Sequence, residues 1–175
     1  MIRPALRADI ECLTQLIDTS VRELHRAYYT AAQIELALRK VFGVDTVLVD
    51  DQTYFIVEED GEIVACGGWS KRATLYGGDN FAGRTDDLLD PAREPAKIRA
   101  FFVRPSQARR GLASLLLERC EREAAAAGFR RAEMGATLSG VPFYAARGYV
   151  ETARADVALS PDLTMPIVRM ERNLP

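Results

Sequence analysis

Apolar residues recur at helical spacing in three stretches of the chain. Asp9 is a candidate N-cap for the first helix, the second begins at Thr30, and the third follows from Ala113. Gly43 and Gly128 stand where left-handed C-caps would close the second and third. The pattern therefore predicts three helices, each with one apolar face.

Runs of β-branched and aromatic residues predict strands between and after these helices. The strands are expected at residues 2–4, 46–50, 53–58, 62–70, 98–103, 132–137, 149–158 and 168–172. Asp60-Gly61 supplies the turn of a hairpin between the third and fourth of these strands. A short helix is expected at 141–146. Because the two strands at 98–103 and 132–137 flank a helix, they are expected to be parallel with a right-handed crossover.

The segment 71–96 follows neither period. It is rich in Gly, Asp, Arg and Pro, and it is longer than an ordinary connection between elements. We interpret it as a functional loop or lid.

Composition limits the class of protein. A chain of 175 residues that is 48% hydrophobic is long enough for one well-buried domain, expected over 1–175. The net charge of −2 and pI near 5.6 argue against nucleic acid as a partner. Cys12, Cys66 and Cys120 are widely spaced, which favours reduced core thiols in a cytoplasmic protein over disulfides or a metal site. No apolar run approaches the ~20 residues of a membrane span.

The junction between the strand at 98–103 and the following helix has the features of a phosphate site. Pro105 stops the strand, and the first-turn N–H groups around 108–113 have no intrahelical acceptor. The helix dipole favours an anion at the same end. Gly111 permits a close approach, while Arg109 and Arg110 supply positive charge. The spacing excludes a P-loop and a dinucleotide fingerprint, although one glycine and two arginines would also suit ordinary capping.

Three motifs in order carry a resemblance to a known family. They are Val103-Arg104-Pro105, Ala108-Arg109-Arg110-Gly111-Leu112-Ala113 and Phe143-Tyr144-Ala145-Ala146-Arg147-Gly148-Tyr149. Together they resemble the GCN5-related N-acetyltransferase (GNAT) family, whose pattern is Val-x-Pro, Gln/Arg-x-x-Gly-x-Gly/Ala and Phe-Tyr-x-x-x-Gly-Phe/Tyr. Ala108 departs from this pattern at the Gln/Arg position. The family uses mainly the backbone N–H there, so the departure affects a side-chain contact and not the cradle.

The resemblance implies an α/β fold with a mixed, mostly antiparallel central sheet, helices on both faces and a splayed parallel strand pair that binds acyl-CoA. It implies acetyl-CoA as co-substrate and no metal. The pantetheine arm would pair with the first strand of that pair like an added strand, and the N–H of Val103 would be the oxyanion donor. The implied CoA-binding residues are Phe101, Phe102, Val103, Ala108, Arg109, Arg110, Gly111, Leu112, Ala113, Ser114, Ser139, Phe143 and Tyr144.

Acyl transfer to an amine needs a proton for the departing thiolate, and a phenol can supply it. A tyrosine with a reference pKa of about 10 stays protonated at neutral pH, whereas a thiol has about 8.5. Tyr144 stands at the motif position that fits this role, so it is the expected catalytic acid; the alternative is a packing tyrosine beside Phe143.

The sequence does not identify the general base, and it offers only candidates for the acceptor pocket. The carboxylates considered are interpreted as solvated: Glu58, Glu59, Asp79, Asp86, Asp87 and Glu133. His25, the one histidine, is interpreted as a structural residue with satisfied hydrogen bonds, although it could face the acceptor site. Trp69 and Tyr76 are candidates for the acceptor pocket, and Trp69 fits the core equally well.

Two function classes remain. The favoured one is an N-acetyltransferase that moves an acetyl group directly from acetyl-CoA to a primary amine, of a small molecule in the first instance, with a protein amine left open. The alternative is a non-catalytic acyl-CoA-binding or interaction module on the same fold, because fold alone does not fix activity. No nucleic acid or membrane partner is expected, and a homodimer is left open.

Overall fold

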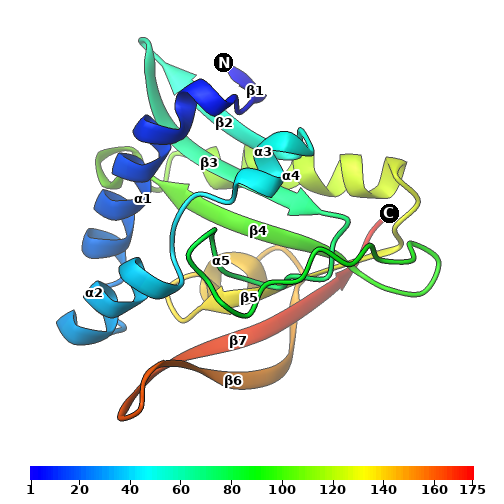
Figure 1. The fold of residues 1–175 in the computed structure, drawn as a ribbon. Coiled ribbons are helices and arrows are strands. Elements are labelled where there is room, and N and C mark those ends of the chain that lie inside the picture. The colour runs from blue at the N-terminus through cyan, green and yellow to red at the C-terminus, as the bar shows by residue number, and fades with distance from the viewer.

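The computed structural model describes residues 1–175, and its strands form one seven-stranded sheet in the order β1-β2-β3-β4-β5-β7-β6 (Figure 1). The strands are β1 (Ile2–Pro4), β2 (Tyr54–Glu59), β3 (Glu62–Ser70), β4 (Ala96–Val103), β5 (Arg131–Thr137), β6 (Val150–Ser160) and β7 (Leu163–Asn173). Every neighbouring pair is antiparallel except β4 and β5, which are parallel. The expected mixed sheet is confirmed.

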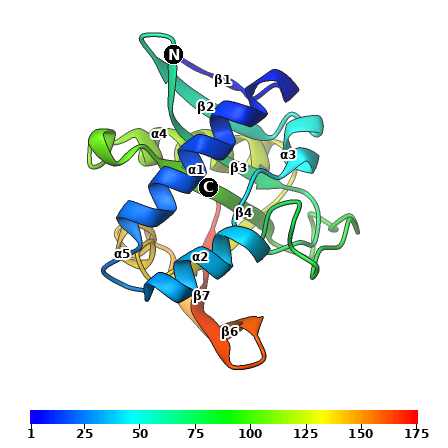
Figure 2. The same cartoon turned by 60° about the vertical axis from the view of Figure 1, so that its left-hand side comes forward.

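Helices cover both faces of this sheet, as expected. They are α1 (Ile10–Leu24), α2 (Ala31–Lys40), α3 (Thr46–Asp50), α4 (Leu112–Ala126) and α5 (Val141–Ala145), with 3-10 turns η1 (Arg7–Asp9) and η2 (Pro105–Gln107). Figures 1 and 2 show α1, α2 and α3 on one face and α4 on the other. None of these helices is both long and apolar enough to cross a membrane.

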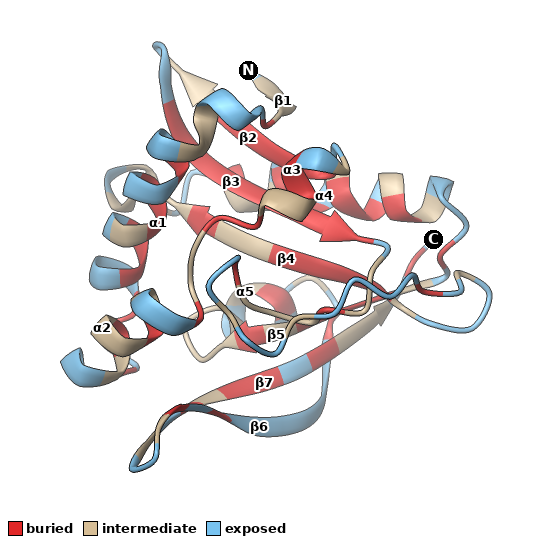
Figure 3. Ribbon diagram, in the orientation of Figure 1, coloured by how far each residue is buried: buried red, intermediate tan, exposed pale blue.

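Strand β2 shows how the sequence builds two cores. Phe55 and Val57 pack in the cluster that contains the apolar face of α4, while Tyr54 and Ile56 pack in the cluster under α1, α2 and α3. Successive side chains of a strand point to opposite faces, so a continuous apolar run serves both clusters. Figure 3 shows the consequence: β2, β3 and much of β4 are buried between the two helical layers.

The strand predicted at 46–50 is wrong, because these residues form α3. The β-branched sequence Thr-Val-Leu-Val favours a strand by propensity. However, the carboxylate of Asp45 accepts a hydrogen bond from the N–H of Val47 at 3.2 Å and caps a helical turn. Leu48 and Val49 of that turn are buried in the core, so tertiary packing overrides the local preference.

The long segment 71–95 is irregular, as expected, with a single β-bridge between Arg72 and Leu88. The hairpin of β2 and β3 turns at Asp60 and Gly61, whose φ angles of 49° and 79° are the left-handed values that such a turn needs. Strand β7 is longer than predicted: Pro166 belongs to it, although a proline argues against a central strand. It is accommodated because pairing with β5 ends at Ile167.

The parallel strands β4 and β5 pair at only two positions, Ala96 with Ala132 and Lys97 with Glu133. Beyond Lys97, β4 bulges, with a left-handed φ of 55° at Ala100, and it pairs there only with β3. The two strands therefore splay apart toward their C-terminal ends, as the resemblance implies.

Two expectations about burial are wrong. Glu133 is fully buried and not solvated: its carboxylate bonds the ammonium of Lys97 and the guanidinium of Arg169. These partners come from β4 and β7, the two neighbours of β5 in the sheet, which the local sequence around Glu133 does not reveal. Among the cysteines, Cys66 and Cys120 are buried free thiols, whereas Cys12 is exposed on α1.

Candidate functional site

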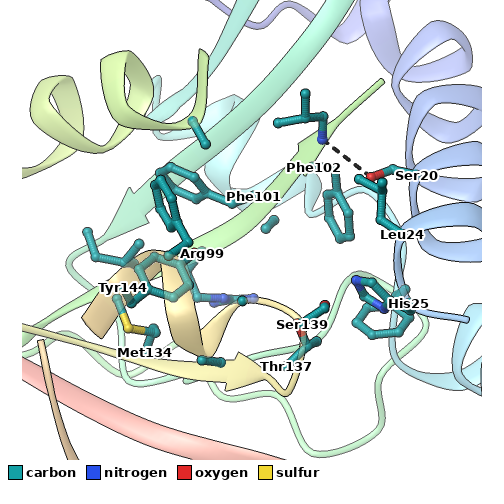
Figure 4. Close-up of a pocket in the computed structure, with 18 of the residues that line it drawn as sticks. Ser20, Leu24, His25, Arg99, Phe101, Phe102, Met134, Thr137, Ser139 and Tyr144 are labelled. Atoms are coloured by element: carbon teal, nitrogen blue, oxygen red, sulfur yellow. Dashed lines mark hydrogen bonds between the residues drawn. The ribbon is translucent and has the colours of Figure 1, made fainter. Parts of the chain in front are cut away.

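A cleft of about 820 Å³ opens where β4 and β5 splay. Its walls are residues 98–103 of β4 and 134–137 of β5, the start of α4, and α5 (Figure 4). The end of α1, the segment 41–43 after α2 and the loop residues 75–78 complete it. Its volume lies in the ordinary range for a small-molecule site.

One end of the cleft is lined by unpaired backbone N–H groups. The N–H groups of residues 109–114 donate to no acceptor in the protein, and Gly111 caps α4 without a side-chain bond. Arg109 and Gly111 have left-handed φ angles of 64° and 86°, and a Cβ added at Gly111 would meet no atom within 4 Å. The local sequence thus builds an open cradle for an anion at a helix N-terminus.

Three arginines stand near this cradle, but only two line the cleft. Arg109 and Arg147 line it, whereas Arg110 turns away to pair with Glu59 at 2.7 Å and with Gln107. The guanidinium of Arg147 lies 3.9 Å above the ring of Phe143 and bonds the hydroxyl of Ser114. The cradle and the two facing cations suit the diphosphate of CoA, so the residues present fit this group.

Tyr144 closes the side of the cleft between the splayed strands. Its ring packs edge-on against Phe143 at 4.9 Å and Phe101 at 6.3 Å, and its side chain is buried. Gly140 leaves room for it, since a Cβ there would lie 3.2 Å from the ring. The phenol has no hydrogen-bond partner in the protein, and burial raises its pKa above the usual value. It is therefore a protonated donor facing the cleft.

The N–H of Val103 is already engaged. It donates a hydrogen bond to the hydroxyl oxygen of Ser20 on α1, at 3.3 Å (Figure 4). Ser20 is almost fully buried, lines the cleft, and its own hydroxyl proton has no acceptor in the protein. The N–H that the resemblance assigns as oxyanion donor is therefore bonded to Ser20 of α1, and the hydroxyl of Ser20 is the donor available in the cleft.

No carboxylate lines the cleft. Glu58 pairs with Arg3, Asp79 accepts from the backbone N–H of Thr46, and Glu133 lies in its buried ion cluster. No group of three or more His, Cys, Asp and Glu side chains is placed to hold a metal ion.

His25 does line the cleft, from the end of α1. It is 7% exposed and its Nδ1 has no hydrogen-bond partner, so the expectation of a satisfied structural histidine is wrong. Burial lowers the pKa of His25 to about 4, and the imidazole is uncharged at neutral pH.

The two aromatic candidates for the acceptor pocket separate. Tyr76 lines the cleft and packs across β5, where a Cβ added at Gly135 would lie 2.9 Å from its ring. Trp69 belongs to the core under α4, 6.0 Å from the ring of Phe129, and does not reach the cleft.

Sequence comparison decides the family. The model of the acetyltransferase (GNAT) family matches residues 18–149, well over half of the chain. The chain belongs to the GNAT family. No curated protein sequence matches it.

Solved GNAT structures share its fold. The GCN5-related N-acetyltransferase of Rhodopseudomonas palustris superimposes with a TM-score of 0.73 at 20% identity, over 99% of this chain and 95% of that one. The ribosomal-protein-alanine N-acetyltransferase of Brucella melitensis gives 0.67 at 16% identity, over 99% of both chains. YncA of Salmonella typhimurium, solved with its cofactor acetyl-CoA, gives 0.66 at 18% identity, over 100% of this chain and 94% of that one.

Of the CoA-binding residues expected from the GNAT motifs, all but Arg110 line one cleft. Sequence reasoning missed Arg147 and Ser20. Arg147 stands inside the third motif, four positions after Phe143, so the sequence does contain a signal for this cation. Ser20 had no such signal, because its partner Val103 is distant in the sequence.

Proposed function

We propose that this GNAT protein is an N-acetyltransferase that moves an acetyl group directly from acetyl-CoA to the primary amine of a small molecule. The observation that carries the proposal is the unpartnered phenol of Tyr144 beside the splayed strands, in the same cleft as the N–H cradle at 109–114. One cleft thus offers an anion site for the cofactor and a proton donor for the leaving group.

In the proposed reaction, the lone pair of a neutral amine attacks the thioester carbonyl carbon, a C–N bond forms and the C–S bond breaks. Tyr144 gives its phenolic proton to the leaving sulfur. The amine nitrogen loses one proton to water, and water returns one proton to the phenolate of Tyr144. Ser20, supported by the N–H of Val103, donates to the carbonyl oxygen as negative charge develops there.

The residues for CoA have separate tasks. The N–H groups of 109–114 and the cations of Arg109 and Arg147 would hold the diphosphate. Phe101, Phe102 and Val103 line the splay and would position the pantetheine arm, and Ser139 lines the same cleft. Arg110 would act only indirectly, by holding Glu59 and Gln107 beside the cradle.

A small-molecule acceptor is supported by the walls of the cleft. The end of α1, the loop residues 75–78 and β7 line the half of the cleft away from the cradle. We also infer that the chain is one domain, since both cores share a single sheet. Buried free thiols at Cys66 and Cys120 suit a cytoplasmic protein.

The decisive test is release of free thiol from acetyl-CoA in the presence of a panel of amines, with calorimetry of CoA binding in parallel. Amine-dependent thiol release supports the transferase. CoA binding without thiol release from any amine would instead support the alternative, a non-catalytic acyl-CoA-binding module.

A further inference from the structure

The half of the cleft away from the CoA cradle, which we call the acceptor lobe, has a distinctive lining. It is formed by Leu24, Tyr28, Phe42, Leu75, Tyr76 and Ile167. These side chains come from the end of α1 and the turn after it, the segment after α2, the loop and β7. The lobe is thus largely aromatic and aliphatic, with the uncharged polar side chains of Ser20, His25, Thr137 and Ser139 beside these residues.

Formal charge in the cleft is confined to arginines, and the one nearest the acceptor lobe, Arg99, is paired with a carboxylate that it shares with Arg84. Arg99 donates to Asp45 at 2.7 Å and to the backbone oxygens of Thr74 at 2.8 Å and Gly77 at 2.6 Å. Arg99 and Asp45 are both almost fully buried. Arg109 and Arg147 stand at the cradle, where the CoA phosphates would pair with them.

None of the polar side chains of the acceptor lobe is a carboxylate, and His25 carries no charge at neutral pH because burial lowers its pKa to about 4. A second ammonium group on an acceptor would therefore leave water without an anionic partner, which is strongly unfavourable. An apolar body of similar size would gain by leaving water.

The lobe is also fixed in shape. The N–H of Gly78 donates to the backbone oxygen of Val41 at 2.7 Å, and Arg84 donates to the backbone oxygen of Gly77 at 3.2 Å and to Asp45 at 2.8 Å. The loop wall is therefore held to the end of α2 and to the buried Arg99–Asp45 pair. A fixed apolar wall selects acceptors by shape and charge before any chemistry occurs.

We propose that the acceptor is a hydrophobic monoamine, in which a single primary amino group is joined to an aromatic or branched aliphatic body. The proposal rests on the acetyltransferase function proposed above and narrows its substrate class. Polyamines and aminoglycosides are disfavoured, because their additional ammonium groups would face the apolar lining. The same lining favours the uncharged form of the reacting amine, which is the form that attacks.

The test compares amines under identical conditions by thiol release from acetyl-CoA. We expect kcat/KM for 2-phenylethylamine and 3-methylbutylamine to exceed that for 1,4-diaminobutane, spermidine and kanamycin by about tenfold or more, the value of ~1.4 kcal/mol of discrimination. Equal or better use of the polyamines or kanamycin would overturn the substrate class while leaving the acetyltransferase intact. No turnover of any amine would overturn the acetyltransferase itself.

A pair of variants tests whether the absence of a carboxylate in the lobe causes this selectivity. Leu24 lines the lobe and is 37% exposed, so Leu24→Asp adds a carboxylate at its rim without burying it fully. We expect this variant to shift the ratio of kcat/KM for 1,4-diaminobutane over 2-phenylethylamine upward by about tenfold. Leu6→Asp is the matched control, because Leu6 is 52% exposed and lies outside the cleft. An unchanged ratio in a folded Leu24→Asp protein would overturn the argument from charge.

Discussion

The backbone N–H of Val103 donates a hydrogen bond to the hydroxyl of Ser20, 3.3 Å away and 83 positions earlier in the chain. The bond joins the C-terminal end of β4 to α1 at the point where β4 and β5 have separated. Because Ser20 lines the cleft and its hydroxyl proton has no acceptor in the protein, the serine offers a donor whose oxygen is already polarised.

Ser20→Ala should lower kcat by about tenfold. Removal of an oxyanion donor typically costs ~10²–10³ in rate, and the loss should be smaller here because the variant frees the N–H of Val103 to take over. Ser20→Thr keeps the hydroxyl and should recover most of the rate. Steady-state kinetics with acetyl-CoA varied give kcat and KM separately. If kcat stayed constant while KM for acetyl-CoA fell, Ser20 would be a competitor for the N–H and not a donor to the substrate.

Gly111→Asp should weaken CoA binding by at least an order of magnitude. The substitution places a negative charge in the cradle of free N–H groups, where the helix dipole favours the phosphates. Gly61→Asp is a matched control, because Gly61 also has a left-handed φ, 79°, and open space around its Cβ position, but lies in the β2–β3 turn. If titration calorimetry found the same affinity for CoA in both variants, the diphosphate would not bind at this site.

Tyr144→Phe should lower turnover far more than CoA affinity, by ~10²–10⁴, the usual value of general acid catalysis. The ring and its contacts with Phe101 and Phe143 remain, so the cleft keeps its shape. Tyr149→Phe supplies the contrast. Its hydroxyl donates to the buried Glu121 at 2.8 Å outside the cleft, so its loss should lower Tm and leave kcat nearly unchanged. A Tyr144→Phe enzyme with unaltered kcat, measured when chemistry limits the rate, would make Tyr144 a packing residue.

The sequence predicts those parts of the site that are formed by consecutive residues. The cradle at 109–114 needs only a glycine at a helix start after a strand, and these features are contiguous. The burial of the Glu133 carboxylate cannot be predicted from its sequence neighbours, because its partners Lys97 and Arg169 lie on the neighbouring strands. For α3, a single capping carboxylate and core packing outweighed β-branched propensity, and neither strength can be read from the local sequence.

His25 should make the stability of the protein depend on pH. Burial holds its pKa in the folded protein at about 4, below the reference value of about 6.5, so the unfolded chain binds the proton first as pH falls. The free energy of unfolding therefore does not vary with the protonation of His25 above pH ~6.5, and it falls as the pH is lowered from ~6.5 toward ~4. His25→Phe removes this titration. Between pH 7.5 and 5, the free energy of unfolding of the wild type should fall by about 2 kcal/mol relative to that of the variant. Urea denaturation at the two pH values measures it, and a constant difference would mean that the imidazole is not desolvated.

The acceptor amine must lose a proton before it can react. An alkylamine with a reference pKa near that of lysine, about 10.4, is almost wholly an ammonium at neutral pH and cannot attack the thioester. No carboxylate lines the cleft, and His25, with a pKa of about 4, is a poor base at neutral pH. We therefore expect the apolar lobe to select the neutral amine and water to carry its proton. At low acceptor concentration the rate should rise with pH toward the amine's own pKa.

The variants of the candidate bases should follow the same rule. His25→Ala, Glu58→Gln and Asp79→Asn should each lose less than ~100-fold, the low end of general-base effects, because none of these groups takes the proton. A water-carried proton also predicts that acceptors of lower pKa reach their maximal rate at lower pH. If the pH profile levelled off near 7 for amines of different pKa, and one of these variants lost far more activity than the others, that residue would be the base, and selection of the neutral amine by the lobe would not account for the reaction.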